Sequence, residues 1–101
     1  MNITTSDLFE KITESNYNIG IAMASGYIVL DSVVTSAYLT EDDKLELYYR
    51  GDNVLVITDD NAIFEVEEAI VYEPNRDYLW CYDVEDSYGD IICSVYAFLD
   101  K

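Results

Sequence analysis

The chain has 101 residues and a formal net charge of −16 at pH 7, because 21 acidic residues face five basic ones. Half of its residues are hydrophobic, which excludes a disordered acidic tail and predicts one domain, residues 1–101, with its own core. It has no apolar run of about 18 residues and no basic, apolar leader. We therefore expect a cytoplasmic protein without a membrane span.

The negative charge is concentrated in the middle of the chain, since residues 41–90 contain sixteen acidic and three basic residues. A net charge of about 2–8 in magnitude is enough to keep a small domain soluble, and a larger excess destabilises the compact state by self-repulsion. Lysine is scarce, although many tyrosines, isoleucines and asparagines indicate an AT-rich coding sequence that would also supply lysine. We interpret the acidic excess as functional; adaptation to high salt is the alternative.

The first predicted element is a short amphipathic helix from Thr4 to Ser15, capped by Ser6 or Asp7. Its apolar stripe consists of Leu8, Phe9 and Ile12. Alternating residues then predict a strand over 17–23 and a second over 27–35, joined as a hairpin at Ser25-Gly26. Residues 36–44 are expected to be a connection that ends in an acidic turn.

Residues 45–68 predict three strands in a meander. Gly51-Asp52 suits a two-residue type II′ turn that places Tyr49 opposite Val54, and a turn centred on Asp60 places Val56 opposite Phe64. Both registers direct one set of side chains inward: Leu45, Leu47, Tyr49, Val54, Val56, Phe64 and Val66. The other face carries an apolar strip, which we expect the N-terminal helix or a partner to cover: Leu55, Ile57 and Ile63.

The C-terminal third is also predicted to be β-rich. A β-bulge near Glu67-Glu68 would turn Ala69 and Val71 inward, or the strand could simply end there. Residues 73–76 are predicted to form a turn. A strand over 77–84 is expected to carry four residues on one face: Tyr78, Trp80, Tyr82 and Val84. Residues 91–99 are apolar on both faces, which favours a central strand over a helix.

These elements predict an α+β domain, with a short N-terminal helix packed on a mostly antiparallel sheet of six or seven strands. Cys81 and Cys93 are expected to be small, reduced core residues. A hairpin that turned at Ser87 would place them opposite each other, so a bridge between them is geometrically conceivable.

Catalysis has little support in the sequence. The chain lacks histidine, the commonest general base, and a cysteine nucleophile would lack its usual imidazole partner. We expect neither enzymatic activity nor a cofactor. A Ca²⁺-binding β-domain is an alternative, because Asp83, Glu85 and Ser87 alternate near Gly89. The EF-hand pattern fails there, since its glycine comes one place late and its twelfth position is Ser94.

The acidic residues are better explained as imitations of phosphate groups. Five basic residues exclude direct nucleic-acid binding. Side chains on one face of a strand, such as Glu65 and Glu67, repeat every ~6.6 Å, which is close to the spacing of neighbouring phosphates. The candidate carboxylates are Glu41, Asp42, Asp43, Asp59, Asp60, Glu65, Glu67, Glu68, Asp83, Glu85, Asp86 and Asp90. Two tyrosines expected to be exposed, Tyr48 and Tyr88, would add aromatic contacts with the partner.

Small, very acidic, tyrosine-rich chains of this length resemble phage-encoded DNA mimics, the anti-CRISPR and anti-restriction proteins. The opening residues are also similar to the first helix of one anti-CRISPR inhibitor of an RNA-guided DNA nuclease: Met1-Asn2-Ile3, Asp7-Leu8, Ile12 and Tyr17. This similarity covers residues 1–17, and the later strands depart from that inhibitor. The resemblance implies a protein of the host-cell cytoplasm that blocks a PAM-reading or DNA-holding groove.

The expected partner is therefore a basic nucleic-acid-binding protein, such as a CRISPR effector nuclease or a restriction enzyme, and the chain itself is expected to be a monomer or a homodimer. The competing hypothesis is a structural interaction module that forms a homo-oligomer through the strip of Leu55, Ile57 and Ile63.

Overall fold

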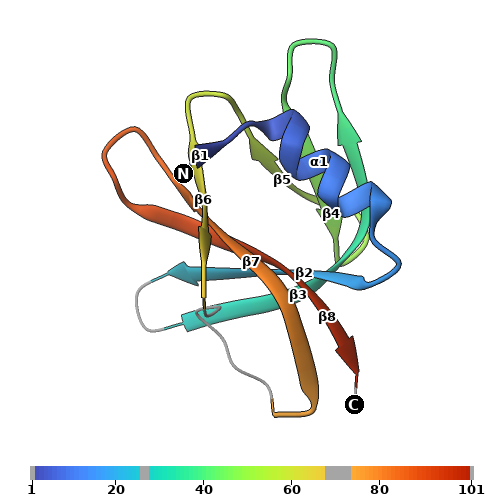
Figure 1. The fold of residues 1–101 in the computed structure, drawn as a ribbon. Coiled ribbons are helices and arrows are strands. Elements are labelled where there is room, and N and C mark those ends of the chain that lie inside the picture. The colour runs from blue at the N-terminus through green and yellow to red at the C-terminus, as the bar shows by residue number, and fades with distance from the viewer. Residues whose placement is uncertain (1, 26–27, 68–73, 101) are drawn as a thin grey trace.

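The computed structural model describes residues 2–25, 28–67 and 74–100. This part of the chain forms one short helix and one mostly antiparallel sheet of eight strands (Figure 1). The α+β prediction is confirmed, but the strand number of six or seven is wrong. The strands are β1 (Asn2–Ile3), β2 (Asn18–Ser25), β3 (Ile28–Leu39), β4 (Leu45–Tyr49), β5 (Asn53–Ile57), β6 (Ala62–Val66), β7 (Arg76–Glu85) and β8 (Ile91–Asp100).

The helix α1 (Thr5–Glu14) begins one residue later than predicted and is capped by Thr4. The Thr4 hydroxyl accepts a hydrogen bond from the Asp7 amide (3.0 Å), and the Asp7 carboxylate accepts one from the Thr4 amide (3.1 Å). This reciprocal pair satisfies two amides that the helix itself leaves unpaired. Ser6 and Asp7 are therefore not the cap, and Asp7 occupies the third helical position.

The sheet order is β1-β6-β7-β8-β2-β3-β4-β5, so β5 and β6 do not form the predicted second hairpin of the meander. The pairing of Val56 with Phe64 is wrong, because Phe64 pairs with Asn2 and Asp83. Six antiparallel pairings lead from β6 to β5, so the two strands run in the same direction along the sheet. Only residues 58–61 connect them, and the sheet must therefore coil until the end of β5 reaches the start of β6.

Strand β3 provides the bend that this coiling needs. It is twelve residues long and pairs with β2 along its first half and with β4 along its second half. The register shifts between Val34 and Ser36, and the intervening Thr35 donates a hydrogen bond to the Tyr48 carbonyl (3.2 Å). An extra residue of this kind bends a strand and increases its twist. Beyond this bend the strand continues to Leu39. The predicted connection over 36–44 is therefore wrong for residues 36–39, and only its acidic turn lies outside the strands.

The hairpin of β4 and β5 is confirmed, but its predicted register is wrong by one residue. Its loop has three residues, Arg50 to Asp52, with φ of 46° at Arg50 and 79° at Gly51. Tyr48 therefore pairs with Val54, and Leu47 with Leu55. Because a shift of one residue exchanges the two faces of a strand, the predicted inward side chains of β5 point outward.

The main core lies between α1 and the inner face of the coiled sheet. Ile57 and Ile63 are almost fully buried within it, and Leu55 packs against it. The predicted apolar strip is thus part of the core, together with Leu8 and Ile12 of the helix, and it offers no docking surface. The buried residues of this cluster are Leu8, Ile12, Ile19, Ile21, Leu45, Leu47, Ile57, Ile63, Tyr82, Val84, Cys93, Val95 and Ala97.

Strand β8 is central and buried on both faces from Cys93 to Phe98, as predicted. A register shift between Tyr78 and Trp80 turns Tyr78 to the outer face, so the prediction that it shares a face with Trp80 is wrong. Val84 pairs with Cys93, and Cys81 pairs with Tyr96. The cysteines therefore pack in different clusters, both are free, and burial raises the pKa of each thiol to about 12.

A second, smaller core covers the outer face around Tyr96. The Tyr96 ring lies over Gly20, its direct cross-strand partner, and its hydroxyl donates a hydrogen bond to Asp31. The Arg76 guanidinium donates to the Asp31 carboxylate (3.1 Å) and lies over the Phe98 ring (4.1 Å). Strand β6 ends at Val66 and Glu67 follows it as an exposed residue. The rest of the predicted bulge, Glu68, and the predicted inward side chains of Ala69 and Val71 fall outside the described residues.

The contact between Gly20 and Tyr96 yields a stability prediction. A Cβ atom at Gly20 would lie 2.4 Å from the Tyr96 ring, and both residues are buried. Gly20→Ala should therefore lower the free energy of unfolding in urea by about 1–3 kcal/mol through overpacking. In a Tyr96→Leu background, where the ring is absent, the same substitution should cost clearly less. Equal costs in the two backgrounds would contradict the steric explanation.

Candidate acidic interface

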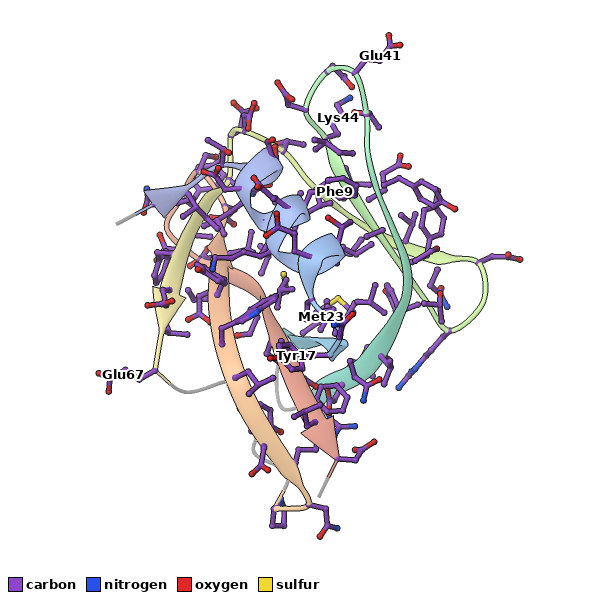
Figure 2. All side chains as sticks on the ribbon, turned by 45° about the vertical axis from the view of Figure 1, so that its right-hand side comes forward. Phe9, Tyr17, Met23, Glu41, Lys44 and Glu67 are labelled. Carbon is purple, nitrogen blue, oxygen red and sulfur yellow. The ribbon has the colours of Figure 1, made fainter. Side chains whose placement is uncertain are left out.

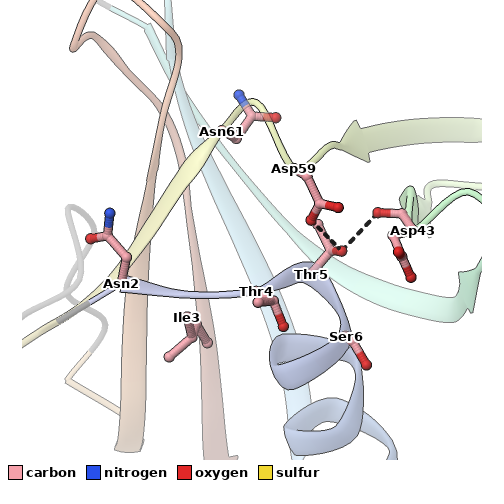
Figure 3. A pocket seen from close by; sticks show the side chains of 8 residues that line it. All are labelled: Asn2, Ile3, Thr4, Thr5, Ser6, Asp43, Asp59 and Asn61. Atoms are coloured by element: carbon pink, nitrogen blue, oxygen red, sulfur yellow. Dashed lines mark hydrogen bonds between the residues drawn. The ribbon is translucent and has the colours of Figure 1, made fainter.

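Three acidic turns lie in a row at one end of the molecule: residues 40–44 and 58–61 beside the start of α1, and residues 86–90 beyond 58–61 (Figure 1). The Thr5 hydroxyl is 2.7 Å from the Asp43 carbonyl and 3.2 Å from the Asp59 carboxylate, so it connects the first two turns (Figure 3). The Asn61 side-chain amide donates to the Glu85 carbonyl (3.1 Å), which connects the second turn to the end of β7.

We call the carboxylates of these turns and of the first helical turn the acidic rim: Asp7, Glu41, Asp42, Asp43, Asp59, Asp60, Glu85, Asp86 and Asp90. Glu85 and Asp86 are half-buried, and the other residues of the rim are exposed. Eight of the nine belong to the predicted set of phosphate mimics. Asp7 was missed, because the sequence suggested only a role in helix capping for it.

Each turn is held by hydrogen bonds of its own. Thr40 donates through its hydroxyl to Asp42 (2.5 Å) and accepts from the Lys44 amide (3.0 Å). The Asp86 carboxylate accepts from the amides of Tyr88 (2.9 Å) and Asp90 (3.0 Å). Such side-chain bonds to the local backbone fix a turn without a surrounding core. The carboxylates therefore project from ordered turns.

The charge of the rim is almost uncompensated. Lys44 is its single basic residue and pairs with Asp42 (3.3 Å), but both side chains are exposed and such a pair contributes little stability. Hydrogen bonds from Thr40 and then from Lys44 lower the pKa of Asp42, and those from the Thr4 amide and hydroxyl lower the pKa of Asp7. Both groups are therefore charged at neutral pH.

The rim carboxylates are spread out along the surface. Within residues 2–25, 28–67 and 74–100, no three His, Cys, Asp or Glu side chains gather closely enough to hold a metal ion. A hollow of about 390 Å³ lies between the helix start and the turns, and Figure 3 shows the Thr5 hydroxyl bonded across it. Spaced anions suit an extended cationic surface better than they suit a single cation.

Four predicted site residues lie away from the rim. Glu65 and Glu67 are exposed at β6, which ends at Val66, and Figure 2 shows Glu67 well separated from Glu41. Asp83 is half-buried and accepts a hydrogen bond from Ser94 (2.6 Å). Tyr48 of β4 is the fourth. Glu68 falls outside the described part of the chain.

The two predicted aromatic residues differ in their settings. Tyr88 is 90% exposed at the tip of the 86–90 turn, beside the rim. Tyr48 is half-buried on the outer face of β4, where it meets the Tyr38 ring (5.7 Å between centroids) and donates to Glu46 (3.4 Å). Tyr38 is 57% exposed and was missed, because its segment was read as a connection rather than as part of β3.

Comparisons with protein-family models, with curated proteins and with solved structures give no significant match. In the described residues, the helix is too short to cross a membrane.

The position of Thr5 gives a test of how the rim is held. Thr5→Val keeps the shape of the buried side chain but removes the hydroxyl that bonds the Asp43 carbonyl, which should cost about 1 kcal/mol of unfolding free energy. Amide hydrogen exchange should also accelerate in the turns 40–44 and 58–61. Thr13→Val is the matched control, because Thr13 is exposed and its hydroxyl bonds only within α1.

Proposed function

We propose that this protein inhibits a basic nucleic-acid-binding protein by occupying its nucleic-acid groove with the acidic rim. The observation that carries the proposal is the meeting of three acidic turns on one edge of the molecule with a single lysine among them. A partner groove that evolved to hold phosphates presents spaced arginines and lysines, and spaced carboxylates are complementary to it.

Three further basic residues of the described chain lie outside the three acidic turns. Lys11 lies over the Tyr82 ring (5.7 Å), Arg50 lies in the β4–β5 loop, and Arg76 is held by Asp31 on the outer face. A surface of one sign attracts an oppositely charged partner over about a Debye length, which accelerates association. We place this action in the cytoplasm of a host cell, with an RNA-guided DNA nuclease or a restriction enzyme as the partner class.

Tyr88 extends the proposed contact beyond electrostatics. Its ring is almost fully exposed between Asp86 and Asp90. An exposed tyrosine provides a large contact area at a low entropic cost and stacks on arginine side chains. In this interface Tyr88 would contribute to the lifetime of the complex, whereas the carboxylates would mainly set its rate of formation.

The salt dependence of binding tests the mechanism. A guide-loaded RNA-guided nuclease or a purified restriction enzyme is mixed with a labelled target duplex, and displacement of the duplex by this protein is followed by anisotropy. Salt screens the attraction between the rim and a basic groove, so the affinity, corrected at each salt concentration for the weaker binding of the duplex, should fall at least about tenfold between about 50 and 200 mM NaCl. An affinity for the enzyme that hardly changes with salt would contradict phosphate mimicry.

A matched pair of variants separates the rim from total charge. The rim variant carries Glu41→Gln, Asp60→Asn, Asp86→Asn and Asp90→Asn. The control variant removes the same amount of charge elsewhere, through Glu10→Gln, Glu14→Gln, Asp52→Asn and Asp100→Asn. The rim variant should displace the duplex at least about ten times more weakly than the control, which should resemble the unchanged protein. Equal losses would show that only net charge matters.

A further inference from the structure

The two edges of the sheet are protected to very different degrees. One edge is formed by β1, which has only two residues, and next to it β6 carries Glu65 and is followed by Glu67. Short strands and charged side chains discourage pairing with another chain. The other edge is β5, with the sequence NVLVI, which contains no charge and no proline. This edge therefore lacks the usual protection.

The outer face of β5 is also apolar. Val54 and Val56 are 42% and 40% exposed, and their partners on β4 are Tyr48 and Glu46. Tyr38 on β3 contacts Tyr48 and is itself exposed, so the apolar surface continues inward from the edge. Leu55 and Ile57 face the core on the opposite side. An edge strand with free backbone groups and exposed valines is a favourable template for a further strand.

We propose that β5 pairs antiparallel with β5 of a second copy of this chain, about a two-fold axis at Leu55. In this register Val54 of each copy lies opposite Val56 of the other. The two sheets join into one, and the valines, which are exposed in the single chain, form cross-strand pairs. Such an interface is isologous, as closed dimers require.

Charge complementarity favours a second copy as the occupant. Arg50 precedes β5 and Asp59-Asp60 follows it, so the antiparallel register brings the Arg50 turn of each copy beside the Asp59-Asp60 turn of the other. Among the described residues the ion pairs are Lys44 with Asp42 and Arg76 with Asp31, which leaves the Arg50 guanidinium without a carboxylate partner. In the proposed dimer, the Arg50 guanidinium of each copy gains a carboxylate partner from the other copy.

The net charge gives this dimer a distinctive response to salt. Two chains of charge −16 repel each other, and salt screens this repulsion. Dimerisation should therefore strengthen as NaCl rises from about 50 to about 500 mM, which is opposite to the response expected for binding of a basic groove. A five-residue strand pair is a small interface, so the dimer should be weak and dependent on concentration.

Cysteine cross-linking tests the register directly. Protein with Val54→Cys is mixed with protein with Val56→Cys in a buffer of oxidised glutathione, which is reduced as two thiols become one disulfide. Opposite residues in an antiparallel pair lie about 4.5–5.5 Å apart between Cα atoms, which permits a bridge. The mixture should cross-link at least about ten times faster than either variant alone, whose cysteines would be separated by diagonal distances of about 7–8 Å. The native thiols are buried and have a pKa of about 12, so they should not interfere.

Sedimentation equilibrium with charge reversal provides the second test. The mass should rise above 11.6 kDa with concentration at high salt. Arg50→Asp should move this rise to at least about threefold higher protein concentration, because two exposed, partly screened ion pairs are lost. Adding Asp60→Arg should move it back, while Glu65→Lys at the other edge should leave it unchanged. A chain that stays monomeric under all these conditions, or cross-linking that is equal in the mixture and in the single variants, would overturn the proposal. Neither result would affect binding of the rim to a basic groove, which is measured at low salt by duplex displacement.

Discussion

The connection of two parallel-running strands by residues 58–61 constrains the whole molecule. Strands β5 and β6 point the same way along the sheet, and each is five residues, or about 17 Å, long. A four-residue link between the end of one and the start of the other is possible only if the sheet coils back on itself. The bulge at Thr35 allows that coiling, and the helix fills the space it encloses. The fold is thus a consequence of one short connection.

Strand pairing explains why the acidic turns meet. The turns 40–44 and 58–61 are neighbours because β4 pairs with β5, with Leu45 opposite Ile57. The turns 58–61 and 86–90 are neighbours because β6 pairs with β7, with Ala62 opposite Glu85. The repulsion between the turns destabilises this arrangement. The free energy gained by burying the core side chains, Leu8 and Ile12 among them, has to exceed that repulsion.

Features that depend on local sequence were predicted correctly, and features that depend on long-range strand pairing were not. The helix, its stripe and the central strand β8 were predicted correctly, because they depend on local periodicity. The β4–β5 register was wrong because a left-handed Arg50 lengthens the loop, and arginine gives no sign of positive φ in a sequence. The residues of the turn after β5 were recognised, but a turn signal does not state whether the strands it joins will pair. The predicted β4–β5 hairpin already brings the turns 40–44 and 58–61 together, whereas the position of the 86–90 turn depends on the pairing of β6 with β7, which no local signal specified.

The three-residue loop at Arg50 also determines which side chains the edge strand exposes. With the two-residue loop, Val54 and Val56 would face the core and the edge strand would present Leu55 and Ile57 to a partner. The extra loop residue buries the larger side chains and leaves two valines on the open face. It also positions an arginine at one end of β5, with two aspartates at the other end. The two proposals therefore make opposite electrostatic demands: the proposed binding of the rim to a basic groove requires unscreened charge, and the proposed approach of a second copy to β5 requires that charge to be screened.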